Sequence, residues 1–501
     1  MTVHSPLRRF ALWLTLATLP ALTTLGGCST NPATGEQSFT AFMDAEDEAR
    51  VGAQEHPKMI KEFGGAYADG TLQDYAQRIG EKLAAVSELP KLEWTFTILN
   101  DPAINAFALP GGYVYITRGL MALAENEAEM AGVLAHEIGH VTARHSAQRY
   151  STAKATNIGL TGLSILGSVF GVPSGVGQLV SLGANAALQQ YSQGQELEAD
   201  SLGVRYLIRA GYAPDAMSSF FHKMKGHADL QANLQNKEKR SHSIMSTHPR
   251  TEDRITQAIK LAKEKSVANP VIRRHAYLRH IDGMVFGDDP AQGVVEGRAF
   301  LHPKLKITFR APPGFVLINS PTKILGFGPK DSKARFIFDM ADPKLAPAVR
   351  SLRRYIESGW KHGLELRGVE RFRVNGMAGA TGEARMSGQD GPRDVRLVAI
   401  QLDTEHIYRF AFITPPSESR RLNEELRRTT YSFRRLSDAE ADAVQPLRIG
   451  LVKVRRGDTV AKLARRFPFE RFRREWFRLL NGLGPDDSLR PGRNVKVVTG
   501  Q

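Results

Sequence analysis

Apolar residues recur at helical and strand periods along most of the chain, and they predict several folded regions. Between about 72 and 86 the apolar positions are three or four residues apart, as on the buried face of a helix. Two apolar runs, 94–99 and 113–117, predict strands. A long helical pattern then covers about 126–146. This first region, 44–265, is therefore expected to be mainly helical with a small sheet.

Two further regions are expected after a linker at 266–291. Residues 292–440 mix strand and helix patterns, which indicates an independent α+β domain of unknown role, so the whole chain is an α+β multidomain protein. Residues 447–499 show a strand, two short helices and a strand, a βααβ order. In the middle domain, strands are expected at 305–310, 334–339, 395–402 and 408–413, and helices at 346–362 and 418–431.

One segment of the first region has an unusual composition. Between Lys154 and Glu196 the chain runs for 41 residues without a charged side chain. Pro173 and several glycines interrupt this segment, so we do not expect a spanning helix. Two interpretations remain open: buried helices beside a functional site, or a lid that touches a membrane.

Composition and charge narrow the possible partners. A chain of 501 residues, 42% hydrophobic and 24% charged, should form roughly three or four globular domains. The net charge is +15, and the last 53 residues contribute much of it, with 13 Lys or Arg against 5 Asp or Glu. Such a basic balance admits nucleic acid, an anionic membrane or an acidic glycan. A single cysteine excludes an internal disulfide.

The first residues have the parts of an export signal. Arg8 and Arg9 precede a 16-residue apolar run, and two glycines lead to Cys28. The stretch before this cysteine resembles a bacterial lipobox, which implies that 1–27 is a signal peptide, that Cys28 is lipidated and that 28–43 is a tether. By the same resemblance, Ser29 implies the outer membrane of a Gram-negative bacterium, facing the periplasm. An uncleaved anchor is the alternative, and an exported protein is not expected to bind nucleic acid.

The decisive motif is His136-Glu137-Ile138-Gly139-His140. Residues four apart share one face of a helix, so the two imidazoles can converge on one cation, and neutral imidazole suits Zn²⁺. Glu137 is turned by about 100° and can reach a water at the metal without being a ligand. The acidic residues that open the helix suit its dipole.

A catalytic zinc site needs a third protein ligand, and the best candidate is Glu196. Glu196 and Asp200 are four residues apart on one helical face, whereas Glu198 lies about 200° away from Glu196. We therefore expect Glu196 to be the ligand and Asp200 to be the hydrogen-bonding partner of a ligating histidine. The alternative is a solvated acidic face.

Two residues that follow the motif, His145 and Arg144, are expected to have different roles. His145 is nine residues from His136, about 180° round a continuous helix, which argues against ligation. Arg144 lies one turn beyond His140, and we expect it to support the site from behind.

These motifs together resemble the HtpX and CAAX-prenyl-protease type of zinc metallopeptidases, and within it the branch of periplasmic β-barrel assembly-enhancing proteases. The resemblance rests on 126–145, on 196–200 and on Thr247-His248-Pro249 followed by Arg254, and it spans about 44–265. It implies a gluzincin fold with one zinc per chain, held by His136, His140 and Glu196, and with Glu137 as the catalytic base. The tetratricopeptide module of that branch has no counterpart here.

The resemblance also implies two further roles. His248 would lie near the metal, where it would stabilise an oxyanion or occupy the open position of a latent site. The sheet edge near 105–112 would pair with an extended substrate peptide. The residues expected to bind substrate are Asn105, Ala106, Phe107 and Ala108.

The C-terminal pattern, 447–499, is similar to a LysM module, which binds glycans that contain N-acetylglucosamine. The resemblance implies peptidoglycan as the ligand and places binding at the loop of Gly457, Asp458 and Thr459. The positive charge of this region is compatible with the carboxylates of peptidoglycan. The middle domain is similar to the PsbP-like type.

The expected function is zinc-dependent endoproteolysis of misfolded or misassembled envelope proteins in the periplasm, with the enzyme tethered to the cell wall. Glu137 would move the proton from water to the leaving amine. The alternative is a wall-bound chaperone or assembly factor whose protease site is latent.

Overall fold

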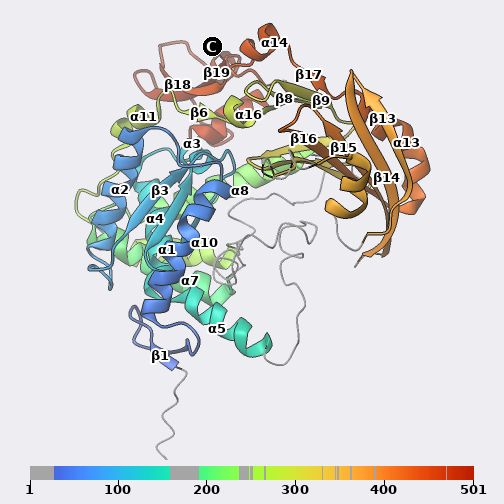
Figure 1. The fold of residues 1–501 in the computed structure, drawn as a ribbon. Helices are drawn as coiled ribbons and strands as arrows, with labels where there is room; N and C mark the ends of the chain where they lie inside the picture. Colours follow the sequence, from blue (N-terminus) through green and yellow to red (C-terminus); the bar gives the residue numbers. More distant parts are fainter. Residues whose placement is uncertain are drawn as a thin grey trace, which may run out of the picture.

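The computed structural model describes residues 28–157, 191–235, 248, 252–264, 267–329, 331–342, 344, 346, 349–360, 364–388, 391–469 and 471–500. The expected signal peptide, 1–27, and most of the uncharged segment lie outside the described residues. In Figure 1 the N-terminal region is blue and green, the middle domain is orange and the C-terminal residues are red. Among the described helices, none has the length and apolarity that a membrane crossing requires.

The segment 28–43, expected to be a tether, folds into a packed hairpin. Strands β1 (Cys28–Thr30) and β2 (Gln37–Phe39) pair antiparallel. The side chain of Asn31 accepts a hydrogen bond from the backbone N–H of Ala33 at 2.9 Å, which closes the turn. Ala33 and Met43 are buried, so the hairpin is held by packing as well as by its own hydrogen bonds.

Two helices and a small sheet follow, of which the apolar pattern predicted the second helix and two of the strands. Helix α1 (Ala45–Glu62) begins at a capping box between Asp44 and Asp47, and Asp69 caps α2 (Gly70–Ala84). The sheet has the strand order β3-β5-β4, so β4 is an edge strand. Its strands are β3 (Thr95–Leu99), β4 (Ala106–Leu109) and β5 (Tyr113–Thr117), and the short helix α3 (Arg118–Leu123) comes next.

The long helix expected at about 126–146 is two helices. Helix α4 (Glu127–Thr142) ends before Arg144, whose φ of 54° is left-handed, and α5 (His145–Asn157) starts in a new direction. Helix α4 contacts α2, α8, β4 and α7 and is buried over nearly its whole length. The other helices that the structure describes in this region are α7 (Gln193–Arg209), α8 (Ala216–Gln235) and α10 (Glu252–Glu264).

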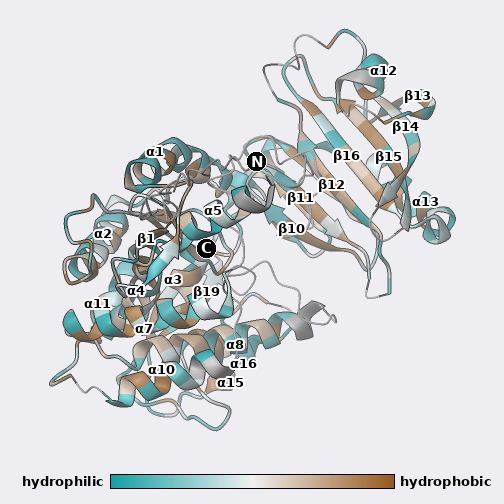
Figure 2. Cartoon of the chain, turned by 90° about the horizontal axis from the view of Figure 1, so that it is seen from below, coloured by the Kyte–Doolittle hydropathy of each residue, from teal (hydrophilic) through white to brown (hydrophobic). Residues whose placement is uncertain are grey.

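The middle domain is built on a seven-stranded antiparallel sheet with the order β10-β11-β12-β16-β15-β14-β13. Figure 2 shows hydrophobic residues along β12, β15 and β16, and hydrophilic ones on helix α13 (Pro416–Tyr431). Its strands are β10 (Val316–Ser320), β11 (Lys323–Phe327), β12 (Arg335–Met340), β13 (Arg367–Val374), β14 (Met377–Gly388), β15 (Gly391–Gln401) and β16 (Ile407–Thr414).

A smaller sheet with the order β17-β9-β8-β7 completes the middle domain. The helix expected at 418–431 is α13 (Pro416–Tyr431). Within the range expected to be a helix at 346–362, the described residues form α12 (Leu352–Arg354) and a π-turn, Tyr355–Gly359. The smaller sheet contains β7 (Val294–Glu296), β8 (Ala299–His302), β9 (Ile307–Arg310) and β17 (Arg434–Arg435), and a 3₁₀ turn, Pro290–Gln292, precedes it.

The C-terminal residues have the expected βααβ order but are not a separate body. Strand β18 pairs with β19 and also with β6 (Val285–Phe286), and β6 lies in the segment expected to be a linker. Helix α11 (Arg274–Ile281) of that segment is also buried, and the module shares one hydrophobic core with the N-terminal region. The remaining elements are α14 (Asp438–Asp442), β18 (Leu447–Lys453), α15 (Val460–Ala464), α16 (Arg473–Leu480) and β19 (Asn494–Gly500).

Candidate metal centre

Helix α4 supplies the two histidines of the centre. It starts at Asn126, whose side chain accepts a hydrogen bond from the N–H of Glu129 at 2.9 Å. One turn separates His136 from His140, and their Nε2 atoms lie 3.0 Å apart, as the spacing predicts. Both imidazoles are buried. Burial holds the pKa of His140 well below its ordinary value, which keeps the ring in the neutral form that binds a metal.

Helix α7 brings a carboxylate to the same point. A capping box between Ser192 and Gln195 starts the helix, so Glu196 lies in its first turn. Its two oxygens lie 3.6 Å from the Nε2 atoms of His136 and His140. The two helices approach closely at a glycine: a Cβ atom on Gly139 would lie 3.1 Å from a backbone oxygen of α7. The backbone at this position therefore allows the carboxylate to reach the histidines.

Asp200 and Arg254 surround these groups. The Oδ1 atom of Asp200 lies 2.9 Å from Nδ1 of His136, where we expected a partner for a ligating histidine. Arg254 of α10 donates two hydrogen bonds of 2.7 Å to Asp200, and its Nη1 lies 2.5 Å from Glu196. Although burial opposes ionisation, the hydrogen bonds from Arg254 and His136 lower the pKa of Asp200, so its carboxylate stays charged.

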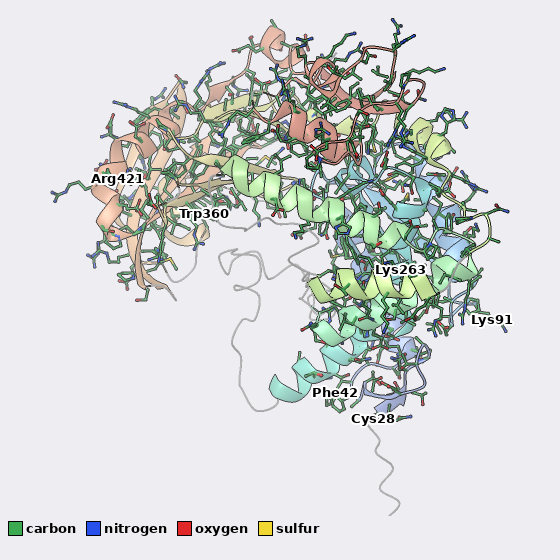
Figure 3. All side chains as sticks on the ribbon, turned by 180° about the vertical axis from the view of Figure 1, so that it is seen from behind. Cys28, Phe42, Lys91, Lys263, Trp360 and Arg421 are labelled. Atoms are coloured by element: carbon green, nitrogen blue, oxygen red, sulfur yellow. The ribbon has the colours of Figure 1, made fainter. Side chains whose placement is uncertain are left out.

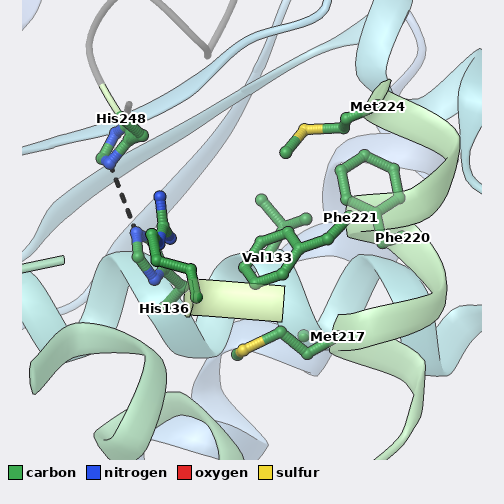
Figure 4. Close-up of a pocket in the computed structure, with 9 residues that line it drawn as sticks. Val133, His136, Met217, Phe220, Phe221, Met224 and His248 are labelled. Atoms are coloured by element: carbon green, nitrogen blue, oxygen red, sulfur yellow. Dashed lines mark hydrogen bonds between the residues drawn. The ribbon is translucent and has the colours of Figure 1, made fainter. Parts of the chain in front are cut away.

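His248 completes a cluster of four possible ligands. Its Nδ1 atom lies 2.8 Å from Oε1 of Glu196 and 3.3 Å from Nε2 of His136, the contact drawn in Figure 4. The ligand atoms of His136, His140, Glu196 and His248 all lie within 4.8 Å of one another. The structure therefore brings together the three predicted ligands and His248.

Several polar atoms in the cluster lack a hydrogen-bond partner. Both carboxylate oxygens of Glu137 and the Nε2 atom of His248 are buried and unpaired, although Nε2 lies 3.6 Å from Glu137. Burial raises the pKa of Glu137 above its ordinary value. Buried polar atoms are normally paired, and such exceptions fit a missing ion or water. Two imidazoles and a carboxylate are the donor set of a catalytic zinc site, so the residues present fit zinc.

Three side chains near His140 were not predicted to take part in the site. Tyr191 stacks on the His140 ring with 3.7 Å between centroids, and the Arg149 guanidinium lies 3.5 Å from the centre of the tyrosine ring. His145, expected on the far side, has its Nδ1 atom 2.8 Å from Nδ1 of His140, because α4 ends before it. No spacing rule predicts these contacts, although Tyr191 closely precedes the Glu196 motif.

Arg144 has a different role from the one expected. Its guanidinium binds Glu48 at 3.0 Å, the Ser29 hydroxyl at 2.8 Å and the Met43 carbonyl at 3.0 Å. Arg144 thus joins the end of α4 to the N-terminal hairpin, and the bonds that it makes do not involve the histidines.

Two hollows flank the cluster. The first is apolar: Figure 4 shows Met217, Phe220, Phe221 and Met224 of α8 on one side, and His136 and His248 on the other. The second lies beside strand β4, where Ala108 and Leu109 face the hollow that His140 also lines. The residues expected to bind substrate thus lie at or next to this edge strand: Asn105, Ala106, Phe107 and Ala108.

The loop expected to bind glycan has structural bonds of its own. The Asp458 carboxylate accepts a hydrogen bond from the N–H of Arg455 at 2.8 Å, and the Thr459 hydroxyl caps α15. Gly457 has a φ of 83°, a conformation that favours glycine.

Comparison with known proteins agrees with this geometry. Residues 71–262 match the family described as Peptidase family M48. The chain is 31% identical over 224 residues to the putative β-barrel assembly-enhancing protease of Vibrio cholerae, a match covering 44% of this chain and 45% of that protein. It is 33% identical over 196 residues to the β-barrel assembly-enhancing protease of Yersinia pestis, covering 38% and 39%.

A third relative is the mitochondrial metalloendopeptidase OMA1 of Schizosaccharomyces pombe, 30% identical over 215 residues, covering 42% of this chain and 59% of that protein. The chain spans less than two thirds of the length of each of these relatives. Among solved structures, cyanobacterial PsbP from Synechocystis matches 30% of this chain and 98% of that chain at 13% identity, but the TM-score of 0.21 supports no argument. Residues 71–262 are therefore similar to peptidase family M48, and within the described part of them the structure gathers side chains that could hold a metal ion.

Proposed function

We propose that this chain is a zinc metalloendopeptidase of the bacterial periplasm that cleaves unfolded or misassembled envelope proteins. The observation that carries the proposal is the buried cluster of His136, His140 and Glu196 beside a carboxylate, Glu137, whose two oxygens have no hydrogen-bond partner. The class of substrate is supported by the relatives that are named β-barrel assembly-enhancing proteases.

The chain's own residues supply the parts of peptide hydrolysis. Zinc, when bound, acts as a Lewis acid that acidifies water and polarises the scissile carbonyl. Glu137, whose pKa is raised by burial, takes a proton from the attacking water and passes it to the leaving amine. Asp200 and Arg254 hold His136 and Glu196 in place. An extended substrate would pair with the edge of β4 that no described strand covers, next to the hollow that His140 lines.

The chain is further proposed to be a lipoprotein of the outer membrane. Cys28 is exposed, and β1 begins at it, so a lipid attached there would hold the hairpin at the membrane surface. In Figure 3, Cys28 and Phe42 lie at one end of the molecule, whereas Trp360 and Arg421 lie in the middle domain, away from that end.

We also propose that 447–499 is a LysM-like module that binds peptidoglycan near Gly457, Asp458 and Thr459. Because this module shares a core with the peptidase domain, wall binding would fix the position of the active site as well. Deleting the module would expose that core, so the test uses the whole chain. We expect it to pellet with purified peptidoglycan and to be released by soluble oligomers of N-acetylglucosamine. A protein that stays in the supernatant would contradict the assignment.

The second candidate function is an assembly factor with a latent protease site. It is favoured by the position of His248, whose Nδ1 atom lies among the ligand atoms of the cluster. In that arrangement His248 would occupy the position that substrate and water need.

One experiment separates the two functions. Residues 29–501 and the Glu137→Gln variant are incubated with an unfolded protein, with and without a chelator. We expect cleavage that needs the metal and that falls about 100- to 10,000-fold in the variant. Equal cleavage by both proteins would contradict the assignment of Glu137. No cleavage by a zinc-loaded protein, followed by cleavage in His248→Ala, would support the latent site.

A further inference from the structure

The ring of His140 is held on its outer side by a second histidine. Nδ1 of His140 lies 2.8 Å from Nδ1 of His145, which is fully buried. This contact exists because α4 ends at Thr142 and the left-handed Arg144 reverses the chain, which brings His145 back against the preceding turn. On a continuous helix the two side chains would point in different directions.

The contact continues outward through two more residues. Nε2 of His145 lies 3.3 Å from Oε2 of Glu198, one of the carboxylates of α7. The other oxygen of Glu198, Oε1, accepts a hydrogen bond of 2.8 Å from the side-chain amide of Asn31. Asn31 is 3% exposed and lies in the turn of the N-terminal hairpin. A chain of contacts thus joins the hairpin to a metal ligand through His145 and Glu198.

In this series of contacts, the direction of each hydrogen bond follows from the bond at the outer end, which Asn31 makes. The oxygen of the Asn31 amide accepts from Ala33 N–H, so its nitrogen must face Glu198. An ionised Glu198 can only accept, so Nε2 of His145 carries the proton and Nδ1 is an acceptor. Nδ1 of His140 must then donate, which leaves the lone pair of its Nε2 facing the other ligands. This is the tautomer that a metal needs.

We propose that Asn31, Glu198 and His145 are positioning residues that set the tautomer and orientation of His140, so that the N-terminal hairpin is part of the metal site. The inference rests on the proposed function as a zinc enzyme. The Nδ1 atoms of the two histidines of α4 have different partners: Nδ1 of His136 faces the carboxylate of Asp200, whereas Nδ1 of His140 faces His145, which in turn contacts Glu198. Partners that orient ligating histidines typically contribute about 10- to 100-fold in metal affinity.

The first test is Glu198→Gln, which keeps the shape of the side chain. Its amide oxygen must accept from Asn31, so its NH₂ group meets the N–H of His145. Two donors would then face each other, and this is avoided only if His145 moves its proton from Nε2 to Nδ1. Nδ1 of His140 must then accept, so that the proton of His140 lies on Nε2. We expect zinc affinity, measured by competition with a chromophoric chelator, to fall about 10- to 100-fold, with the melting temperature of the metal-free protein unchanged. Glu418→Gln is the matched control, because this partly buried carboxylate accepts hydrogen bonds in the middle domain.

The second variant, Asn31→Ser, tests the same contacts independently, in case Glu198→Gln does not fold. Serine keeps an oxygen for the turn but is too short to reach Glu198, so we expect a smaller loss of zinc affinity. Zinc affinities equal to that of the wild type in both variants would overturn the inference, whether or not the wild type cleaves protein. If the variants bound zinc more weakly than the wild type but the wild type cleaved no protein, the positioning roles would be supported and the proposed function would be contradicted.

Discussion

The two ends of helix α4 are equally buried but have opposite electrostatic organisation. At its N-terminal end, Nζ of Lys223 lies 2.6 and 2.7 Å from the two oxygens of Glu129. Just before the helix, Glu125 binds Arg274 at 2.8 Å and also contacts Arg493 of the C-terminal module. Although burial opposes it, Lys223, Arg274 and Arg493 lower the pKa of Glu125 to about 2.

At the C-terminal end the charges are not balanced in this way. Glu137 has no hydrogen-bond partner at either oxygen, and burial raises its pKa. His136 and His140 face a carboxylate that other groups also contact. The comparison teaches that burial alone does not identify a reactive site. Paired charges join domains, whereas unpaired polar atoms at the other end of the same helix indicate a place for a metal and a water.

The largest effect on stability is expected from Lys223→Met, which leaves two buried carboxylates without their shared cation. We expect the free energy of unfolding to fall by about 3–5 kcal/mol, with the same zinc content in the folded protein. Denaturant unfolding measures the change. Lys260→Met, which removes an exposed lysine, is the control and should change stability by less than about 0.5 kcal/mol. A similar small change in Lys223→Met would mean that the N-terminal end is not a structural anchor.

Glu196→Ala should act at the other end, on the metal. We expect zinc affinity to fall by more than about 100-fold, beyond the loss for a residue that only orients a ligand. Zinc stoichiometry after dialysis measures the effect, and Glu264→Ala on the exposed side of α10 is the control. One zinc retained per chain would show that another residue is the third ligand.

The pH dependence of stability tests the contact of the module with α3. Lys496 is fully buried, and its Nζ atom donates to the carbonyls of Ala122 at 2.7 Å and Ala124 at 2.6 Å. Burial lowers the pKa of Lys496 from 10.5 to about 7. Between these values the unfolded chain holds a proton that the folded chain has lost, so stability rises with pH. We expect a gain of about 2 kcal/mol from pH 7 to pH 9 in the wild type relative to Lys496→Met. If the stabilities of the wild type and Lys496→Met changed in parallel with pH, the lowered pKa of Lys496 would be contradicted.

The smallest effect is expected from Glu137→Gln on the stability of the metal-free protein. Because its carboxylate accepts no hydrogen bond that the variant would lose, the free energy of unfolding should change by less than about 1 kcal/mol. Thermal melting without metal measures it. A loss as large as that of Lys223→Met would mean that Glu137 is structural and would remove the contrast between the two ends.

Local signals predicted the elements whose apolar period and capping residues agree. Helix α2 is one example, because Asp69 caps it and the apolar residues at helical spacing within it are buried. Strand β13 was missed, because most of its side chains are charged or exposed and it lacks an apolar run. The break of α4 was missed for another reason: the stretch around Arg144 contains no proline or glycine that would indicate a helix end.

The contacts of the hairpin and of the C-terminal module with the rest of the protein were also not predicted from the sequence. The segment 28–43 is rich in polar residues and was expected to be a tether, but Asn31 and Arg144 bind it to the peptidase domain. The linker at 266–291 contains β6, which pairs with β18 more than 160 residues later in the chain. Neither contact leaves a periodic pattern, because both depend on residues that are far away in the sequence.

By itself the sequence predicted which side chains share a face of each helix, because i, i+4 spacing decides this. His136 and His140 form one such pair and Glu196 and Asp200 the other, and the structure places the two pairs together. Only the tertiary structure decided how these groups are oriented and balanced. His145, Arg254 and Asn31 reach the site through a chain reversal and through contacts between distant segments. The free energy of such contacts comes from packing and desolvation, which no local pattern records.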